Sequence, residues 1–75
     1  MNPIIVSRAV AARPFRSFVL HLPGGRSFSV PSPECIRMPD NEKGRLVIVY
    51  PPSGSSHVVD LFYVTDVEFP RAIIT

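Results

Sequence analysis

The chain has 75 residues, which is enough for one small domain with a single hydrophobic core. Its hydrophobic content of 45% and charged content of 19% are those of an ordinary globular protein and exclude intrinsic disorder. The net charge of +2 excludes a strongly basic surface of the kind that holds nucleic acid through charge alone.

The nine prolines leave little room for long helices and favour short strands and turns. The exception is 2–13, NPIIVSRAVAAR, where Asn2 suits the N-cap position, Pro3 suits the first helical position and Pro14 ends the segment. A run of β-branched residues weakens a helix here. We therefore predict either a short helix or an arm over 1–13.

The stretch FRSFVLHLPGGRSFSV contains two runs of alternating apolar and polar residues around a Pro-Gly-Gly. A loop made of Pro23–Gly25 sets Leu20 opposite Phe28. The same register sets Phe18 opposite Val30, so the large apolar side chains stack on one face. A loop shorter by one residue would place hydroxyl side chains on that face instead. The stretch therefore predicts a β-hairpin in this register.

The loop residues also suit a tight turn. Pro23 has the fixed φ of the second position of a type I turn, and Gly25 accepts the left-handed conformation of the bulge that follows. Pro23, Gly24 and Gly25 are thus predicted to form a structural turn.

Further strands follow the hairpin. Glu34–Met38 is predicted as a short strand with Ile36 and Met38 pointing inward, and a polar loop follows at 40–44. Leu46–Tyr50 is apolar at every position, which is typical of a strand covered on both faces. We place it at the centre of the sheet.

The last third of the chain predicts a turn and two strands. Pro51–Ser56 has the composition of a turn. His57–Leu61 and Val67–Phe69 are predicted as strands, with a 3₁₀ turn between them because the alternation is lost there. The tail at 71–75 is expected to add an edge strand or to fray.

These elements predict a mainly β fold in a single domain, 1–75, with a helix or arm at 1–13, a β core at 14–70 and a tail at 71–75. About five or six short strands in so short a chain require a small, strongly bent antiparallel sheet or barrel, because a flat sheet would leave one face in water. Their order is similar to that of the small barrels of SH3-like and Sm-like proteins.

Several motifs carry a resemblance to a known family. They are RPFRSF at 13–18, HLPGGRSF at 21–28, PE at 33–34 and DLFYVTDVE at 60–68. Together they resemble an uncharacterised family of short bacterial proteins with a PF-x-PF, L-x-DGR and PE pattern. The chain departs from it at Ser17, where proline is usual, and at Gly24, where aspartate is usual. The resemblance implies a bacterial source and a shared β fold, and it implies no activity.

Chemistry-bearing residues are few. Cys35, His57 and Asp60 are the residue types of a cysteine nucleophile with its base and orienting acid, but no local signature surrounds the cysteine. His21, Cys35 and His57 fall on separate predicted strands without the paired spacing of a zinc site. We therefore expect no enzyme activity, no catalytic residue, no cofactor and no metal.

The compartment is predicted from the cysteine content and the N-terminus. The single cysteine excludes an intrachain disulfide and fits a reducing compartment. Arg8 follows the first apolar run instead of preceding it, unlike the basic residues of a secretory signal peptide. No apolar stretch reaches the roughly 20 residues that cross a bilayer. We expect a cytoplasmic protein that does not enter a membrane.

The predicted function is a non-enzymatic protein-interaction or self-assembly module. The apolar strand at 46–50 and the apolar residues at 72–74 suit contact with a protein partner or a second copy. The alternative is a small barrel that binds single-stranded nucleic acid. Its candidate contacts are Arg13, Arg16, Arg26, Arg37, Arg45 and Tyr50. We expect the phenylalanines to fill the core and Tyr50 and Tyr63 to lie at the surface.

Overall fold

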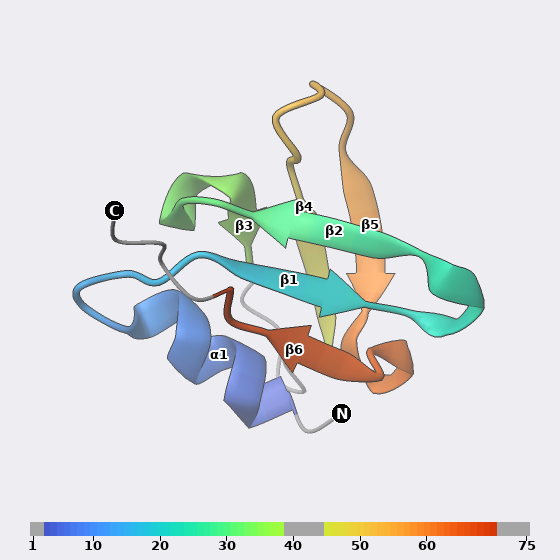
Figure 1. Cartoon of the computed structure of the whole chain (residues 1–75), viewed down its shortest axis with the longest axis horizontal. Helices are drawn as coiled ribbons and strands as arrows, with labels where there is room; N and C mark the ends of the chain where they lie inside the picture. The colour runs from blue at the N-terminus through green and yellow to red at the C-terminus, as the bar shows by residue number, and fades with distance from the viewer. Residues whose placement is uncertain (1–2, 39–44, 71–75) are drawn as a thin grey trace.

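The structure is a computed structural model that describes residues 3–38 and 45–70. Within these residues the chain is mainly β, with one α-helix and six short strands in two three-stranded antiparallel sheets (Figure 1). The first sheet has the order β2 (Ser27–Val30), β1 (Phe18–His21), β6 (Asp66–Glu68). The second has the order β3 (Ile36–Arg37), β4 (Leu46–Val49), β5 (His57–Asp60). In Figure 1 the strands of the first sheet run roughly horizontally, whereas β4 and β5 of the second sheet run roughly vertically. The strands of the two sheets therefore cross at a steep angle.

The two sheets are not closed into a barrel. Among the described strands, none of one sheet pairs with a strand of the other. The chain bends from β2 to β3 through Pro31 and the 3₁₀ turn η2 (Pro33–Cys35), and a second 3₁₀ turn, η3 (Leu61–Tyr63), leads from β5 to β6. Proline lacks the N–H that a ladder needs, so the sheet is interrupted at the first bend. The antiparallel sheet prediction is confirmed, and barrel closure is not found.

The N-terminal segment forms a helix and not an extended arm. The helix, α1, spans Pro3–Ala11, and its predicted cap Asn2 lies outside the described residues. Val6 and Ala9 are buried, so one face of α1 packs on the core. The guanidinium of Arg13 donates hydrogen bonds of 2.9 and 2.7 Å to two backbone carbonyl oxygens just before it. These bonds satisfy carbonyl groups that the end of the helix leaves unpaired.

The β1–β2 hairpin has the predicted register. Leu20 lies opposite Phe28 and Phe18 lies opposite Val30. The three-residue loop is closed by a backbone hydrogen bond of 2.8 Å between the residues that flank it. Phe18, Leu20 and Val30 are almost completely buried, whereas the serines of β2 are exposed. The loop length therefore decides which face of the hairpin enters the core.

The predicted turn type is wrong. Gly24 has φ 81° and ψ 13°, the conformation of the third residue of a type II turn, whereas a type I turn needs a negative φ there. Gly25 has φ 79°, in the left-handed region that was predicted for it. Both positive φ values are accessible because neither residue has a Cβ atom.

Two strand predictions need correction. β3 is shorter than the predicted 34–38, because Pro33–Cys35 forms η2 in place of its first half. β4 is the central strand of its sheet, as predicted, but it is covered on one face only. Val47 and Val49 are buried, whereas Leu46 is 45% exposed. The apolar outer face of this sheet is therefore available for contact.

The remaining order of elements is as predicted. A turn at 51–56 is followed by β5, η3 and β6. Ile36 is buried and Met38 is half-buried, which confirms that they point inward. The loop predicted at 40–44 and the tail at 71–75 lie outside the described residues.

One hydrophobic core joins both sheets and α1. Its buried members are Val6, Ala9, Phe18, Leu20, Val30, Ile36, Val47, Val49, Val59, Leu61 and Val64. The core fills the space between the crossed sheets and leaves β5 at the outer edge of the second sheet.

Replacing Gly24 with alanine tests the turn. No atom lies within 4 Å of a Cβ built there, so the cost arises from the positive φ alone. We expect Gly24→Ala to lower the free energy of unfolding by about 1 kcal/mol in urea denaturation. The exposed Ser27→Ala should change it by less than about 0.5 kcal/mol. Equal losses in the two variants would contradict the assigned turn.

Candidate binding cleft between the hairpin turn and strand β5

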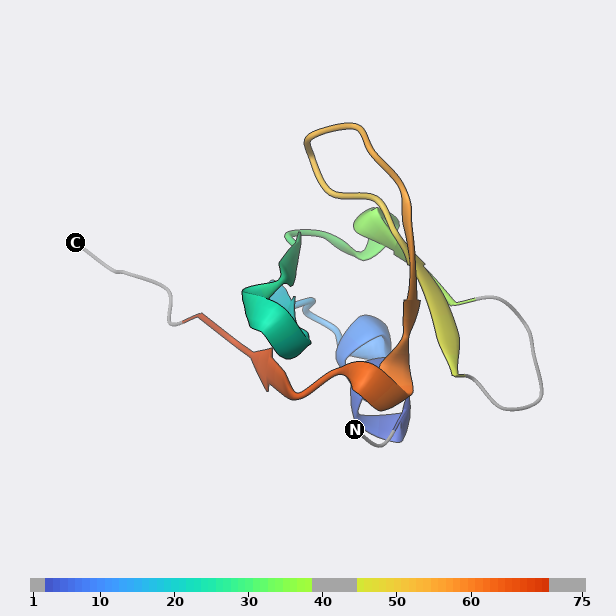
Figure 2. The ribbon, with the colours of Figure 1, turned by 90° about the vertical axis from the view of Figure 1, so that its right-hand side faces the viewer.

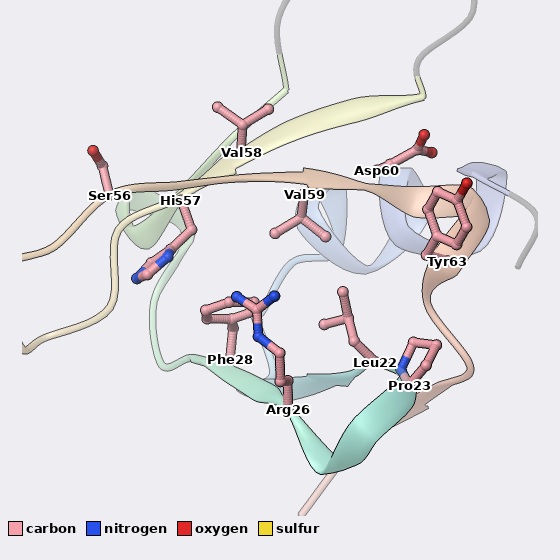
Figure 3. A pocket seen from close by; sticks show the side chains of 10 residues that line it. All are labelled: Leu22, Pro23, Arg26, Phe28, Ser56, His57, Val58, Val59, Asp60 and Tyr63. Carbon is pink, nitrogen blue, oxygen red and sulfur yellow. The ribbon is translucent and has the colours of Figure 1, made fainter.

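A cleft of about 550 Å³ opens between the β1–β2 hairpin and β5. In Figure 2 the hairpin turn lies to the left of β5. Figure 3 shows Leu22 and Val59 pointing toward each other across this cleft, with Phe28 and Arg26 on the hairpin wall and Tyr63 at one end. The floor is thus apolar and the rim carries polar and aromatic groups.

β5 presents its backbone edge to the cleft. The residues at 56–60 all line it, although alternate side chains of a strand point to opposite faces. β5 pairs with β4, and next to that ladder the N–H of Leu61 donates to the carbonyl oxygen of Arg45 at 2.7 Å. Because bonded and non-bonded positions alternate along an antiparallel ladder, the N–H and C=O groups of Val58 and Asp60 point away from β4. The C=O of Asp60, the N-cap of η3, accepts the first hydrogen bond of that turn. The N–H and C=O of Val58 and the N–H of Asp60 therefore form the free edge of the second sheet among the described strands.

An arginine and two rings form the rim beside this edge. The rings of Phe28 and His57 face each other across the cleft with centroids 4.7 Å apart. The guanidinium of Arg26 lies 5.5 Å from the centroid of the Phe28 ring. The contact between a β2 residue and a β5 residue holds the two walls together at one end of the cleft.

Asp60 is among the residues that line the cleft, but Figure 3 shows its carboxylate on the same side of β5 as Val58, away from Leu22 and Val59, and its hydrogen-bonding capacity is occupied. Arg45 donates from Nε to both carboxylate oxygens at 2.8 Å and places Nη2 2.7 Å from one of them. The N–H of Phe62 donates to the same group at 3.0 Å. The hydrogen bond from Arg45 chiefly, with that from Phe62, holds the pKa of Asp60 below its usual value against the opposing effect of desolvation. Among the described residues, no carboxylate contacts Arg26 in this way.

The candidate nucleic-acid contacts lie in separate surroundings. Arg26 lines the cleft, whereas Arg16 lies 5.2 Å from the ring centroid of Phe69 beside α1. The guanidinium of Arg13 donates a hydrogen bond to a backbone carbonyl oxygen at the end of α1, and Arg45 forms the ion pair with Asp60 described above. The other candidates, exposed on or next to the second sheet, are Arg37 and Tyr50. The cleft thus contains Arg26 and none of the other five.

The residues considered for catalysis or metal binding have separate partners. The Sγ atom of Cys35 lies 3.4 Å from the hydroxyl of Ser32, His57 packs in the cleft and Asp60 is ion-paired. His21 lies 2.8 Å from a carboxylate oxygen of β6. In residues 3–38 and 45–70 no three histidine, cysteine, aspartate or glutamate side chains lie together in a group that could hold a metal ion.

The expectation that all phenylalanines fill the core is wrong for Phe62 and Phe69, which are 57% and 40% exposed. Each of these rings lies under an arginine, and a cation over the ring face stabilises an exposed aromatic residue. Tyr63 is 62% exposed, as predicted. The sequence patterns did not identify the cleft, because alternation shows which side chains point inward but not which strand ends a sheet.

Comparison of the chain with models of protein families, with curated proteins and with solved structures finds no match in any of the three. In the part of the chain that the structure describes, no helix is long and apolar enough to cross a membrane. The properties of the cleft are therefore the basis on which a function is proposed.

The ion pair at Asp60 makes stability depend on pH. Because its pKa is lower in the folded protein than the ordinary value of 3.8, the carboxylate stabilises the fold fully above that value. The stabilisation is lost as the pH falls through the lower, folded-state pKa. We expect Asp60→Asn to reduce the free energy of unfolding at pH 7, and the difference from the unmodified protein to shrink in urea denaturation at acidic pH.

The exposed Asp66 is the control for this measurement. Asp66→Asn should have little effect across the same pH range. A loss at Asp60 that stays constant down to the lowest pH would contradict a contribution from the ionised carboxylate.

Proposed function

We propose that the protein is a non-enzymatic interaction module that binds an extended segment of a partner protein as an added strand along β5. The observation that carries the proposal is the free edge of β5, where the N–H and C=O groups of Val58 and the N–H of Asp60 open onto the cleft. An edge of this kind accepts an extended chain because backbone hydrogen bonds supply affinity and side-chain pockets supply specificity.

The side chains around the edge support the same function. Side chains of an added strand would point alternately to its two faces. On the inner face they would meet Leu22, Phe28 and Val59. On the outer face they would meet Val58, which is 70% exposed and lies opposite Ile48 of β4. Apolar surface on both faces favours a strand over a compact ligand.

We also infer an SH3-like arrangement of the strands. It is supported by the succession of β3, β4 and β5 after the bend that ends β2, and by the return of β6 to pair with β1 after η3. Such an arrangement would leave β5 and β6 as the two edges of one interrupted sheet.

Binding of single-stranded nucleic acid is the second candidate, and one observation favours it. Arg26 lies over the ring of Phe28, and the exposed Tyr63 lines the same cleft. Bases stack on aromatic side chains next to a cation, and such binding weakens steeply with salt.

A proline at position 58 tests strand addition. The N–H of Val58 points to the free edge, so Val58→Pro removes a donor for an added strand without removing a bond of the β4–β5 ladder. Peptides of about ten residues selected from a random displayed library are titrated into ¹⁵N-labelled protein. We expect shifts in the amide signals of 56–60, and at least about tenfold weaker binding to the proline variant.

The matched control is Val58→Thr, which keeps the N–H and the β-branch and should bind much as the unmodified protein does. Should Val58→Pro fail to fold, Ser56→Pro removes a donor at the start of the same edge. Unchanged affinity in a folded proline variant would rule out strand addition.

Two other outcomes identify a different occupant of the edge. A solution mass above 8.3 kDa that falls in the proline variant would show that a second copy occupies the edge. Salt-sensitive shifts with mixed-sequence oligonucleotides, centred on Arg26 and Tyr63, in the absence of any peptide response would favour the nucleic-acid candidate.

A further inference from the structure

We propose that the cleft selects acidic partner segments, in which an aspartate or glutamate side chain and a large apolar side chain stand two residues apart on one face of the added strand. The inference rests on the proposed function and names the chemistry of the partner. It depends on the charge of the cleft and on the positions of its apolar and basic groups.

The charge of the cleft is set by Arg26. Two residues with charged side chains line the cleft, Arg26 and Asp60, and Figure 3 shows the Asp60 carboxylate on the side of β5 away from Leu22 and Val59. The carboxylate of Asp60 accepts hydrogen bonds from Arg45 and from the N–H of Phe62, so it has little capacity left for a partner. Arg26 contacts the ring of Phe28 and, within the described residues, no carboxylate. The unmatched charge at the mouth of the cleft is therefore positive.

An anionic group of the partner complements this arrangement. A guanidinium held over a ring keeps its N–H donors available in a plane, which suits a carboxylate that accepts two hydrogen bonds. Apolar groups surround Arg26, so a free inorganic phosphate ion matches the cleft less well than a carboxylate carried by a peptide with apolar side chains. Charge complementarity thus favours an acidic side chain opposite Arg26.

The spacing follows from strand geometry. In Figure 3 the Arg26 guanidinium lies between the pair formed by Phe28 and His57 on one side and the pair formed by Leu22 and Val59 on the other. An added strand that places an acidic side chain at Arg26 directs its next side chain away from the cleft. The residue after that returns to the same face about 7 Å along the strand and reaches the apolar pair.

An acidic side chain within the segment fits better than a free chain end. Arg26 lies in the middle of the cleft and not at one end, with lining residues of β5 extending to both sides of it (Figure 3). A chain that terminated at Arg26 would leave part of the β5 edge without a partner. The acidic group opposite Arg26 is therefore the side chain of an internal aspartate or glutamate.

The test uses peptides that differ at one position. Their background is threonine and valine, and their ends are acetylated and amidated. A glutamate, glutamine or lysine stands two residues before a leucine in one set and two residues after it in a second set, so that both directions of the added strand are tested. Affinity is measured by the amide shifts of 56–60. We expect the glutamate peptide to bind about tenfold more tightly than the glutamine peptide, and the lysine peptide to bind most weakly. The preference should shrink in high salt.

A register control separates position from net charge. Moving the glutamate one residue further from the leucine places the two side chains on opposite faces of the strand. That peptide should lose most of the preference although its composition is the same. Equal binding of both peptides would overturn the proposed spacing.

Charge reversal in the protein is the second test. Arg26 is exposed, so Arg26→Glu should fold, and it should reverse the order of the glutamate and lysine peptides. Arg26→Lys should retain the preference for glutamate in weakened form. The matched control is Arg37→Glu, an exposed arginine of β3 outside the cleft, which should leave the order unchanged.

The outcomes distinguish this inference from the proposed function. If the three peptides bind equally and shift the amide signals of 56–60, strand addition stands and acidic selection is wrong. If the preference appears only with an unblocked C-terminus, the internal acidic residue is wrong. If no peptide shifts these signals, both proposals are wrong.

Discussion

The register of the β1–β2 hairpin is the constraint on which the rest of the structure depends. It sets Phe18 opposite Val30 and Leu20 opposite Phe28, so one face of the hairpin is apolar. That face packs on the second sheet and on α1 in the single core. A slip of one residue would turn serine side chains inward and phenylalanine outward. The same register places Phe28 and Arg26 on the wall of the cleft, so folding and the candidate site share one cause.

The small size of the chain explains why the site lies at a strand edge. One core between two crossed sheets uses most of the buried apolar side chains, and two- to four-residue strands do not close around it. Among the described strands the second sheet therefore ends at β5, with the N–H and C=O of Val58 directed away from β4 and its side chain exposed on the outer face. Larger proteins cover such edges with further elements, whereas this chain presents its edge beside a cleft.

Arginine and phenylalanine side chains form a recurring contact on this surface. Arg16 lies over Phe69, Arg26 over Phe28 and Arg45 over Phe62, in each case with the guanidinium within 5.5 Å of the ring centroid. These contacts account for rings that remain partly exposed in a chain without tryptophan. Because each arginine lies over a different ring, the three positive charges are separated on the surface, and Arg26 is the one of the three that lines the cleft. Selectivity for one acidic group follows from this distribution more naturally than attraction to a long polyanion.

Local patterns in the sequence determined the elements, and the tertiary structure decided how their surfaces are used. The alternation around Pro23–Gly25 and the break after Asp60 were enough to predict the hairpin register and the 3₁₀ turn, because each depends on neighbours in the chain. For residues 1–13 the sequence left a helix and an arm as alternatives, and the structure has the helix α1. Three features needed the fold: the free edge of β5, the exposed outer face of β4 and the pairing of Asp60 with Arg45. Each arises between segments far apart in sequence, and hydrophobic periodicity reports only whether a residue faces apolar surroundings. It does not report which strand lies last in a sheet or whether a second layer covers that strand. The sequence patterns therefore could not predict the cleft, whose position depends on how the two sheets cross.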